Sequence, residues 1–182
     1  VDDLASTLSP EEKATALRGW GSQVLHDLEE GSSSDPIGRA LVHTARTFEI
    51  PIDYFRAFLK SMEMDLTKTT YETYAELEEY MYGSAAVIGL QMLPILSRNN
   101  ARSPEAISAA MKLGNAFQLA NFIRDIGEDL DRNRIYIPRE DLSSFELTAQ
   151  HLQAKSINPK IIAMIKFEIA RVRKLQEEAE VG

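Results

Sequence analysis

The segment from Leu113 to Pro138 constrains the fold of this 182-residue chain more than any other part of its sequence. Polar side chains recur in this segment at intervals of three and four residues, which places them in one stripe if the segment is helical. They are Gln118, Asn121, Asp125 and Asp129. Most residues between them are apolar, a pattern typical of a helix that is buried nearly all round. We therefore expect a long central helix that begins after Ser103, ends near Asp131 and is buried.

A bound divalent metal ion is the simplest explanation for two carboxylates on a buried helix, because unpaired charge is costly to bury. Asp125 and Asp129 are one helical turn apart, roughly 6 Å at about 1.5 Å rise per residue. Asn121 adds a neutral oxygen one turn earlier. Oxygen ligands suit Mg²⁺, with Mn²⁺ as the other candidate. The alternative is a helix whose surface carboxylates simply pair with arginines.

Three arginines surround the acidic stripe: Arg124, Arg132 and Arg134. The planar guanidinium group offers paired donors that match phosphate oxygens. Together with the carboxylates, these arginines favour a site for a phosphorylated ligand held through metal ions. The residues from Arg132 to Pro138 are expected to be extended, because the residue before a proline avoids helical backbone angles.

Helix start signals recur along the chain and indicate an all-α protein. A capping residue precedes proline at Ser9-Pro10, Asp35-Pro36 and Ser103-Pro104, and Thr73 precedes a helix expected from Tyr74 to about Leu96. The net charge of −8 and the absence of a basic stripe argue against nucleic-acid binding. The chain has no cysteine, and its most apolar run, Ser84 to Leu96, is too short to cross a bilayer.

The pattern LGxxxQxxNFxRDxxxDxxxxRxYxP resembles the second aspartate-rich signature of the squalene/phytoene synthase family. A further family signature is matched upstream by Tyr80 to Gly89, followed by Met92 and Ile95. The resemblance runs over all 182 residues. It implies an all-α class I isoprenoid (terpenoid) synthase fold around a central cavity. Because the family carries helices on both sides, we expect residues 1–182 to be a single isoprenoid-synthase domain truncated at both ends.

The resemblance also implies a role for individual residues. Asp125 and Asp129, with Asn121, would bind metal, and Asp2 and Asp3 would bind metal from the opposite side as the start of the family's first DDxxD motif. Ser6 stands where that motif has its last aspartate.

The remaining site residues follow from the same comparison. Tyr80 would face the reacting carbons, and Asp65 would lie in the same cavity. Gln118 and Arg124 would orient phosphate oxygens. Arg134 would lie near phosphate and Tyr136 near the lid of the site.

Small side chains at Gly83, Ala86 and Gly89 leave little bulk on one side of the helix that carries Tyr80. Glycine inside a helix costs about 1 kcal/mol relative to alanine, so two of them suggest a purpose. One purpose is close packing against a neighbouring helix. The other, implied by the family, is room for a long lipid tail.

The implied activity is head-to-head condensation of two geranylgeranyl diphosphates to phytoene through a cyclopropyl (prephytoene) diphosphate, with Mg²⁺ and without NADPH. One alternative is a squalene or dehydrosqualene synthase that uses farnesyl diphosphate. Another is a catalytically silent relative that binds prenyl diphosphate, which the change at Ser6 allows. We expect a cytoplasmic protein, with peripheral contact to the inner membrane as a route for product release; the sequence does not indicate its oligomeric state.

Overall fold

The computed structural model describes residues 8–97, 103–154 and 156–180, and these residues are mostly helical, as predicted. The helices up to the central one are α2 (Pro10–Glu30), α3 (Pro36–Thr47), α4 (Ile52–Met64), α5 (Tyr74–Met81), the π-helical turn η1 (Tyr82–Ala86) and α6 (Val87–Leu96). They are followed by α7 (Pro104–Arg124), α8 (Ile126–Asp131), α9 (Arg139–Ser144), α10 (Ala149–Gln153) and α11 (Pro159–Glu180). None of the helices in the described ranges is both long and apolar enough to span a lipid bilayer.

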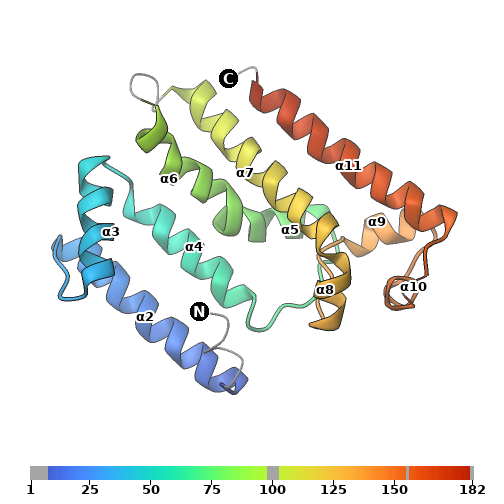
Figure 1. The fold of residues 1–182 in the computed structure, drawn as a ribbon, viewed down its shortest axis with the longest axis horizontal. Helices are drawn as coiled ribbons and strands as arrows, with labels where there is room; N and C mark the ends of the chain where they lie inside the picture. Colours follow the sequence, from blue (N-terminus) through green and yellow to red (C-terminus); the bar gives the residue numbers. More distant parts are fainter. Residues whose placement is uncertain (1–7, 98–102, 155, 181–182) are drawn as a thin grey trace.

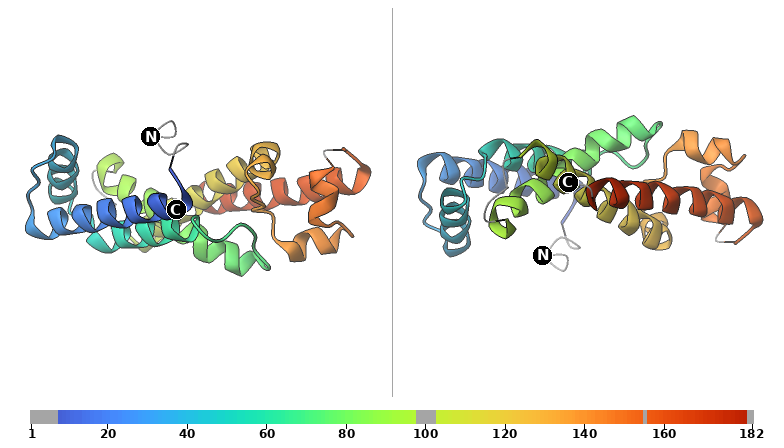
Figure 2. Two further views of the ribbon diagram at one scale, coloured as in Figure 1. Left: turned by 90° about the horizontal axis from the view of Figure 1, so that it is seen from below. Right: turned by 90° about the horizontal axis from the view of Figure 1, so that it is seen from above.

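The long helices lie side by side in roughly one layer, in the order α2, α4, α6, α7, α11 (Figures 1 and 2). The most extensive packing is between α7 and α11. Helix α3 crosses one end of this layer, and the short helices α8, α9 and α10 gather at the other end (Figure 1). The layer therefore places α7 between α6 on one side and α11 on the other.

The predicted helix starts are confirmed by their hydrogen bonds. Ser9 and Glu12 form a reciprocal capping box at the start of α2. The Asp35 carboxylate accepts a hydrogen bond from the Gly38 backbone N–H at 2.7 Å, and the Ser103 hydroxyl accepts one from the Ala106 N–H at 3.1 Å. Each satisfies a backbone donor that the first helical turn leaves free.

The small residues of the Tyr74–Leu96 segment allow its neighbours to approach closely. A Cβ atom added at Gly83 would lie 2.1 Å from the Ala57 carbonyl oxygen of α4. A Cβ atom at Gly89 would lie 2.2 Å from the Ala110 carbonyl oxygen of α7. Because backbone atoms occupy these positions, only glycine fits there, and close helix packing explains both glycines.

The Tyr74–Leu96 helix contains a feature that the sequence pattern did not predict. Its middle turn, Tyr82–Ala86, is π-helical, and it separates α5 from α6 without ending the helix. Single π-helical turns are rare and often occur at functional sites. The turn shifts the register of the side chains beyond it relative to a regular α-helix.

Two predictions for the central helix are wrong. The helix does not run unbroken to Asp131, because the backbone at Asp125 (φ −97°, ψ 9°) leaves the helical range and separates α7 from α8. Nor is it buried all round, since Phe117 is 57% exposed and Leu113 is 40% exposed. The reason is that a single layer covers α7 only on the sides that contact α6 and α11, so an apolar face of α7 lines an open groove.

The predicted extended segment, Arg132 to Pro138, is confirmed. The Ile135 N–H donates to the Thr69 carbonyl oxygen at 2.8 Å, and Thr70 and Ile135 form an isolated parallel bridge. The Arg139 N–H then donates to the Tyr71 carbonyl oxygen at 2.9 Å. These bonds hold the segment beside the loop that connects α4 to α5.

Candidate active site

The Asp65 carboxylate is shared by residues from three parts of the chain. Tyr80, on α5, donates its hydroxyl to Asp65 Oδ2 at 2.8 Å. Tyr136, on the extended segment, donates to Asp65 Oδ1 at 3.1 Å. Arg134 donates from Nη2 to the Asp65 backbone carbonyl at 2.9 Å and from Nη1 to the Tyr136 hydroxyl oxygen at 3.3 Å. Four residues predicted separately from the sequence are thus brought into one hydrogen-bonded cluster.

Aromatic rings enclose this cluster. Tyr136 stacks on Phe122 of α7 with ring centroids 4.1 Å apart and an interplanar angle of 7°. Tyr71 stacks on Tyr136 at 5.9 Å and contacts Tyr80 at 5.6 Å, and it is only 1% exposed. The rings exclude water from the Asp65 carboxylate on one side and present π-electron faces beside it.

The burial of the cluster fixes the protonation state of its tyrosines. Burial, and next the negative charge of Asp65, raises the pKa of Tyr80 well above its ordinary value of 10.0. The same causes raise the pKa of Tyr136 to about 12. Burial works against the charge of Arg134, but Tyr136 and Asp65 outweigh it and raise the pKa of the guanidinium group. At neutral pH both tyrosines are therefore neutral hydrogen-bond donors, and Arg134 is a cation.

The acidic stripe lies where α7 ends and α8 begins. The Asp129 N–H donates to the Asp125 carbonyl oxygen at 2.9 Å, so the two residues remain one turn apart across the break. Asp125 accepts two hydrogen bonds of 2.6 Å from the guanidinium group of Arg124, which lower the pKa of its carboxyl group. Burial, and next the negative charge of Asp125, raises the pKa of Asp129. Two carboxyl groups therefore repel each other at this end of α7.

This donor set fits a divalent cation in its chemistry. The repulsion between Asp125 and Asp129 is what a shared cation would relieve, and both groups offer the oxygen ligands that Mg²⁺ prefers. Among the described residues, however, no group of three or more His, Asp or Glu side chains is arranged to hold a metal ion by itself. Asp2 and Asp3, predicted as the opposing ligands, lie outside the described residues.

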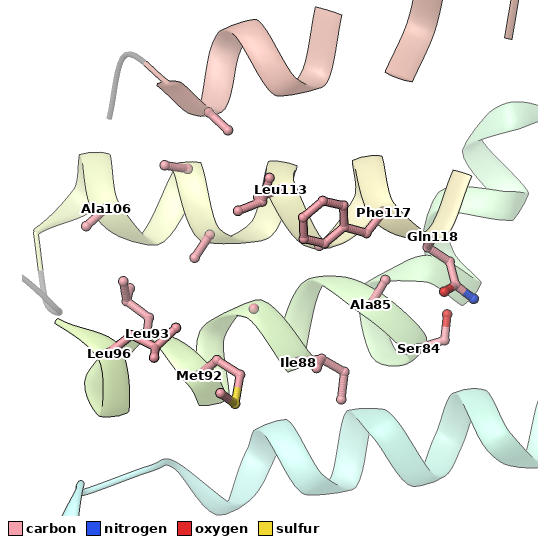
Figure 3. A pocket seen from close by; sticks show the side chains of 15 residues that line it. Ser84, Ala85, Ile88, Met92, Leu93, Leu96, Ala106, Leu113, Phe117 and Gln118 are labelled. Carbon is pink, nitrogen blue, oxygen red and sulfur yellow. The ribbon is translucent and has the colours of Figure 1, made fainter. Parts of the chain in front are cut away.

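An apolar groove runs between α6 and α7, with one contact from α11 (Figure 3). Its volume is about 570 Å³. Apolar side chains of both helices form its walls, among them Ile88, Met92 and Leu96 of α6 and Leu113 and Phe117 of α7. Gln118 lies at one end of the groove, one turn before Asn121 and Phe122 on α7.

The three small residues predicted to make room for a lipid tail differ in their positions. Gly89 lines the groove, although its lack of a side chain is also required by the contact with Ala110. Gly83 and Ala86 are not among the groove residues; Gly83 packs against α4, and Ala86 is 1% exposed within the core. The width of the groove therefore depends on close helix packing as much as on the small residues themselves.

Comparison with known proteins assigns the chain to a family. Residues 1–182 match the family model described as squalene/phytoene synthase. The chain belongs to the squalene/phytoene synthase family. Members of this family are prenyltransferases, and the family resemblance on which the sequence predictions rest is confirmed.

Curated family members with similar sequences include phytoene synthases. The chloroplastic phytoene synthase of Daucus carota is 35% identical over 181 residues, which cover 98% of this chain and 44% of the carrot protein. The 15-cis-phytoene synthase of Synechocystis is 35% identical over 187 residues, which cover 98% of this chain and 54% of the cyanobacterial protein. The chain thus spans about half the length of the curated relatives it matches.

Solved structures of family members share the fold. The squalene synthase HpnC from Alicyclobacillus acidocaldarius has a TM-score of 0.83 at 29% identity, covering 91% of this chain and 61% of that one. A dehydrosqualene synthase in complex with ligand has a TM-score of 0.82 at 33% identity, covering 91% of this chain and 57% of that one. The predicted isoprenoid-synthase helical fold is confirmed.

Sequence reasoning missed three residues at this family site. Tyr71 and Phe122 complete the aromatic enclosure. Tyr71 has no distinguishing spacing in the sequence, and Phe122 is one of the apolar residues between the members of the polar stripe, so each resembles an ordinary core aromatic. Ser84, at the end of the groove beside Gln118, lies within a run of small residues and has no distinguishing spacing. Only the fold brings these residues to the site.

Proposed function

We propose that this protein condenses two molecules of geranylgeranyl diphosphate head to head, forming phytoene through a cyclopropyl diphosphate in an Mg²⁺-dependent reaction. The observation that carries the proposal is the apolar groove of about 570 Å³, which ends at Gln118 within one turn of Asn121 and Phe122. A groove of this kind suits a long hydrocarbon chain, and the acidic and basic groups beyond its end suit a diphosphate. The similarity to phytoene synthases from carrot and Synechocystis supports the same product.

Two groups of residues have separate roles in the first step, the ionisation of one substrate. Asn121, Asp125 and Asp129 would hold metal, together with Asp2 and Asp3. Bound Mg²⁺ would supply positive charge that stabilises the departing diphosphate. Gln118, Arg124 and Arg134 would orient phosphate oxygens. The C1–O bond of one substrate breaks, its electron pair leaves with the diphosphate, and an allylic cation remains.

The aromatic enclosure is suited to the cation that follows. The faces of Tyr80 and Phe122 lie on the buried side of the site, where they stabilise positive charge and keep out water that would quench it. The double bond of the second substrate attacks the cation, and loss of one proton closes the cyclopropane ring. A second ionisation releases the other diphosphate, the resulting cation rearranges, and loss of a further proton gives the C40 hydrocarbon without a reductant.

The protonated state of Tyr80 limits how that proton can leave. Because the raised pKa keeps Tyr80 neutral, the phenol can accept a proton only if it passes its own proton on. Asp65 Oδ2, 2.8 Å away, is the acceptor. We therefore assign Tyr80 and Asp65 to a relay, with the released diphosphate as the alternative base.

A second candidate is a squalene or dehydrosqualene synthase that uses farnesyl diphosphate. The observation that favours it is the close structural similarity to proteins with those two names. The two candidates share the site and differ in chain length and in the need for a reductant to make squalene. A catalytically silent relative that only binds prenyl diphosphate is the third candidate.

Competition between substrates separates these candidates. The purified protein is incubated with Mg²⁺ and equal amounts of farnesyl and geranylgeranyl diphosphate, with and without NADPH, and the organic phase is analysed by mass. A C40 product that needs no NADPH supports the phytoene assignment. C30 products alone would replace it with the second candidate, and metal-dependent substrate binding without any hydrocarbon would support the third. Replacing Mg²⁺ with Mn²⁺ in parallel samples tests the choice of metal.

We also propose that product leaves through peripheral contact with a membrane, because a C40 hydrocarbon is insoluble in water. The exposed apolar residues of the groove, such as Phe117 and Met92, provide a surface for that contact. Sedimentation of the protein with liposomes tests the idea, and recovery of all protein in the supernatant would refute it. We also propose that residues 1–182 form a single domain and that the protein is cytoplasmic and located at the inner membrane.

A further inference from the structure

Two polar side chains occupy one end of a groove that is otherwise apolar. Among the described residues that line it, only Ser84 and Gln118 carry polar side chains. They come from facing segments, Ser84 from the π-helical turn and Gln118 from α7, and they point toward one another in Figure 3. The far end of the groove, at Leu96 and Ala106, has only apolar walls.

The Ser84 hydroxyl lacks a hydrogen-bond partner in the described part of the chain, although its oxygen is buried. A serine inside a helix commonly bonds the carbonyl oxygen one turn earlier, but Ser84 makes no such bond. Leaving a buried hydroxyl unpaired costs free energy that alanine at the same position would not cost. A partner supplied by a bound ligand would remove this cost.

The position of Ser84 indicates which part of a ligand it would meet. Tyr80 precedes Ser84 by four residues in the helical segment that forms one wall, and Phe122 follows Gln118 by four residues in the helix that forms the other. Tyr80 and Phe122 contact each other with ring centroids 6.3 Å apart. The polar end of the groove therefore adjoins the aromatic enclosure, where the proposed reaction takes place. A ligand with a polar head and an apolar chain fits with its head at Ser84 and its chain toward Leu96.

We propose that Ser84 is a specificity-determining residue whose hydroxyl donates a hydrogen bond to a diphosphate oxygen of the prenyl substrate lying in the groove. This inference rests on the proposed function, which it deepens by assigning recognition of the head group to the groove itself. A hydroxyl that donates to an anionic oxygen makes a stronger bond than one between neutral groups. The Gln118 amide, with two N–H donors, is placed to support the same head group.

Binding measurements with two ligands that share one chain test the inference. The probes are geranylgeranyl thiolodiphosphate, which resists ionisation, and a C20 hydrocarbon without a head group. Both compete for the groove with an apolar fluorescent dye. The variants are Ser84→Ala, Ser84→Thr, which restores a hydroxyl, and Met92→Ala as a control that removes only an apolar contact.

We expect Ser84→Ala to weaken binding of the thiolodiphosphate about 10- to 100-fold, the range for one hydrogen bond to a charged group, and to leave hydrocarbon binding unchanged. Ser84→Thr should restore preference for the diphosphate, and Met92→Ala should weaken both ligands equally. Unchanged thiolodiphosphate binding by Ser84→Ala, or equal loss for both ligands, would overturn the role of Ser84 while the proposed function stands. If the wild-type protein binds no thiolodiphosphate with Mg²⁺ present, the proposed function itself fails, and the Ser84 assignment with it.

Discussion

The hydroxyl oxygen of Tyr80 lies 2.8 Å from Oδ2 of Asp65, and the tyrosine is the donor of this hydrogen bond. Both residues are enclosed on one side by the rings of Tyr71 and Tyr136. A phenol that is buried and bonded to a carboxylate keeps its proton at neutral pH. The relay proposed for the cyclopropane-forming step follows from this pair.

Replacing Tyr80 with phenylalanine tests the relay. Tyr80→Phe keeps the ring beside the proposed cation but removes the hydroxyl that would accept the substrate proton. We expect hydrocarbon formation to fall about 100-fold or more, the range for loss of a general acid–base group, with little change in substrate affinity. Steady-state kinetics with geranylgeranyl diphosphate measure both quantities.

Tyr82→Phe is the matched control, since Tyr82 is 44% exposed and two residues away on the same helix. It should retain activity near that of the wild type. Wild-type turnover by Tyr80→Phe would leave the released diphosphate as the base.

Replacing the two aspartates of the acidic stripe tests whether they bind metal. Asp125→Asn and Asp129→Asn each remove one anionic oxygen ligand, and we expect each to weaken Mn²⁺ binding at least tenfold in the presence of a prenyl thiolodiphosphate. Electron paramagnetic resonance of free Mn²⁺ measures this directly, without turnover. Glu128→Gln is the control, because Glu128 is an exposed carboxylate on the same short helix, α8. Equal Mn²⁺ binding by all three variants would show that Asp125 and Asp129 are not metal ligands.

Close packing of α4 against the π-helical turn predicts the effect of one added methyl group. Gly83→Ala would place a Cβ atom 2.1 Å from the Ala57 carbonyl oxygen, so the helices must separate. We expect a loss of roughly 1–3 kcal/mol or more in the free energy of unfolding. Gly19→Ala in α2 meets no atom within 4 Å and should gain up to about 1 kcal/mol from helix propensity. Urea denaturation of both variants checks the contrast, and similar stabilities would contradict the close contact.

Much of the fold and part of the site could be predicted from sequence because local chemistry determines them. The caps at Ser9, Asp35 and Ser103 mark helix starts by hydrogen bonds within a few residues. The site residues Asp65, Tyr80, Arg134 and Tyr136 were predicted from the resemblance to the family, and the structure brings them together in one hydrogen-bonded cluster.

The remaining features depend on contacts between distant segments. The exposure of Phe117 follows from the layer arrangement of whole helices, which no periodicity within α7 can indicate. The break at Asp125 interrupts a polar stripe whose spacing is that of a continuous helix. The Ser84 hydroxyl, which has no hydrogen-bond partner among the described residues, lies in a π-helical turn that the sequence pattern did not predict. The packing role of Gly83 required the position of Ala57 on another helix.

A buried carboxyl group on α11 predicts a pH dependence of stability. Glu168 is 1% exposed, accepts a 2.7 Å hydrogen bond from Arg171, and lies near Asp141, which Arg171 also binds at 2.9 Å. Burial is the largest effect on Glu168. The positive charge of Arg171 opposes this effect, and the negative charge of Asp141 adds to it. Together they raise the pKa of the Glu168 carboxyl group from 4.5 to about 7. The folded state then binds more protons than the unfolded state between these values, so stability falls as pH rises from about 4.5 to 7.

The size of this fall is roughly 3–4 kcal/mol at most, at about 1.4 kcal/mol for each unit of pKa difference. Glu168→Gln cannot ionise and should give a flatter stability profile over the same range. The exposed Glu177→Gln, on the same helix, should keep the wild-type profile. Urea titrations at intervals between pH 4.5 and 8 measure the three curves, and parallel curves for wild type and Glu168→Gln would contradict the assignment.

The most direct measurement of the central claim is the product formed from a single substrate. Purified protein is incubated with Mg²⁺ and geranylgeranyl diphosphate, without any reductant, and the extracted hydrocarbons are analysed by mass spectrometry. Head-to-head condensation predicts a C40 hydrocarbon with the mass of phytoene, whose formation stops when the metal is chelated. Unconsumed substrate, or a C20 alcohol as the sole product, would contradict it.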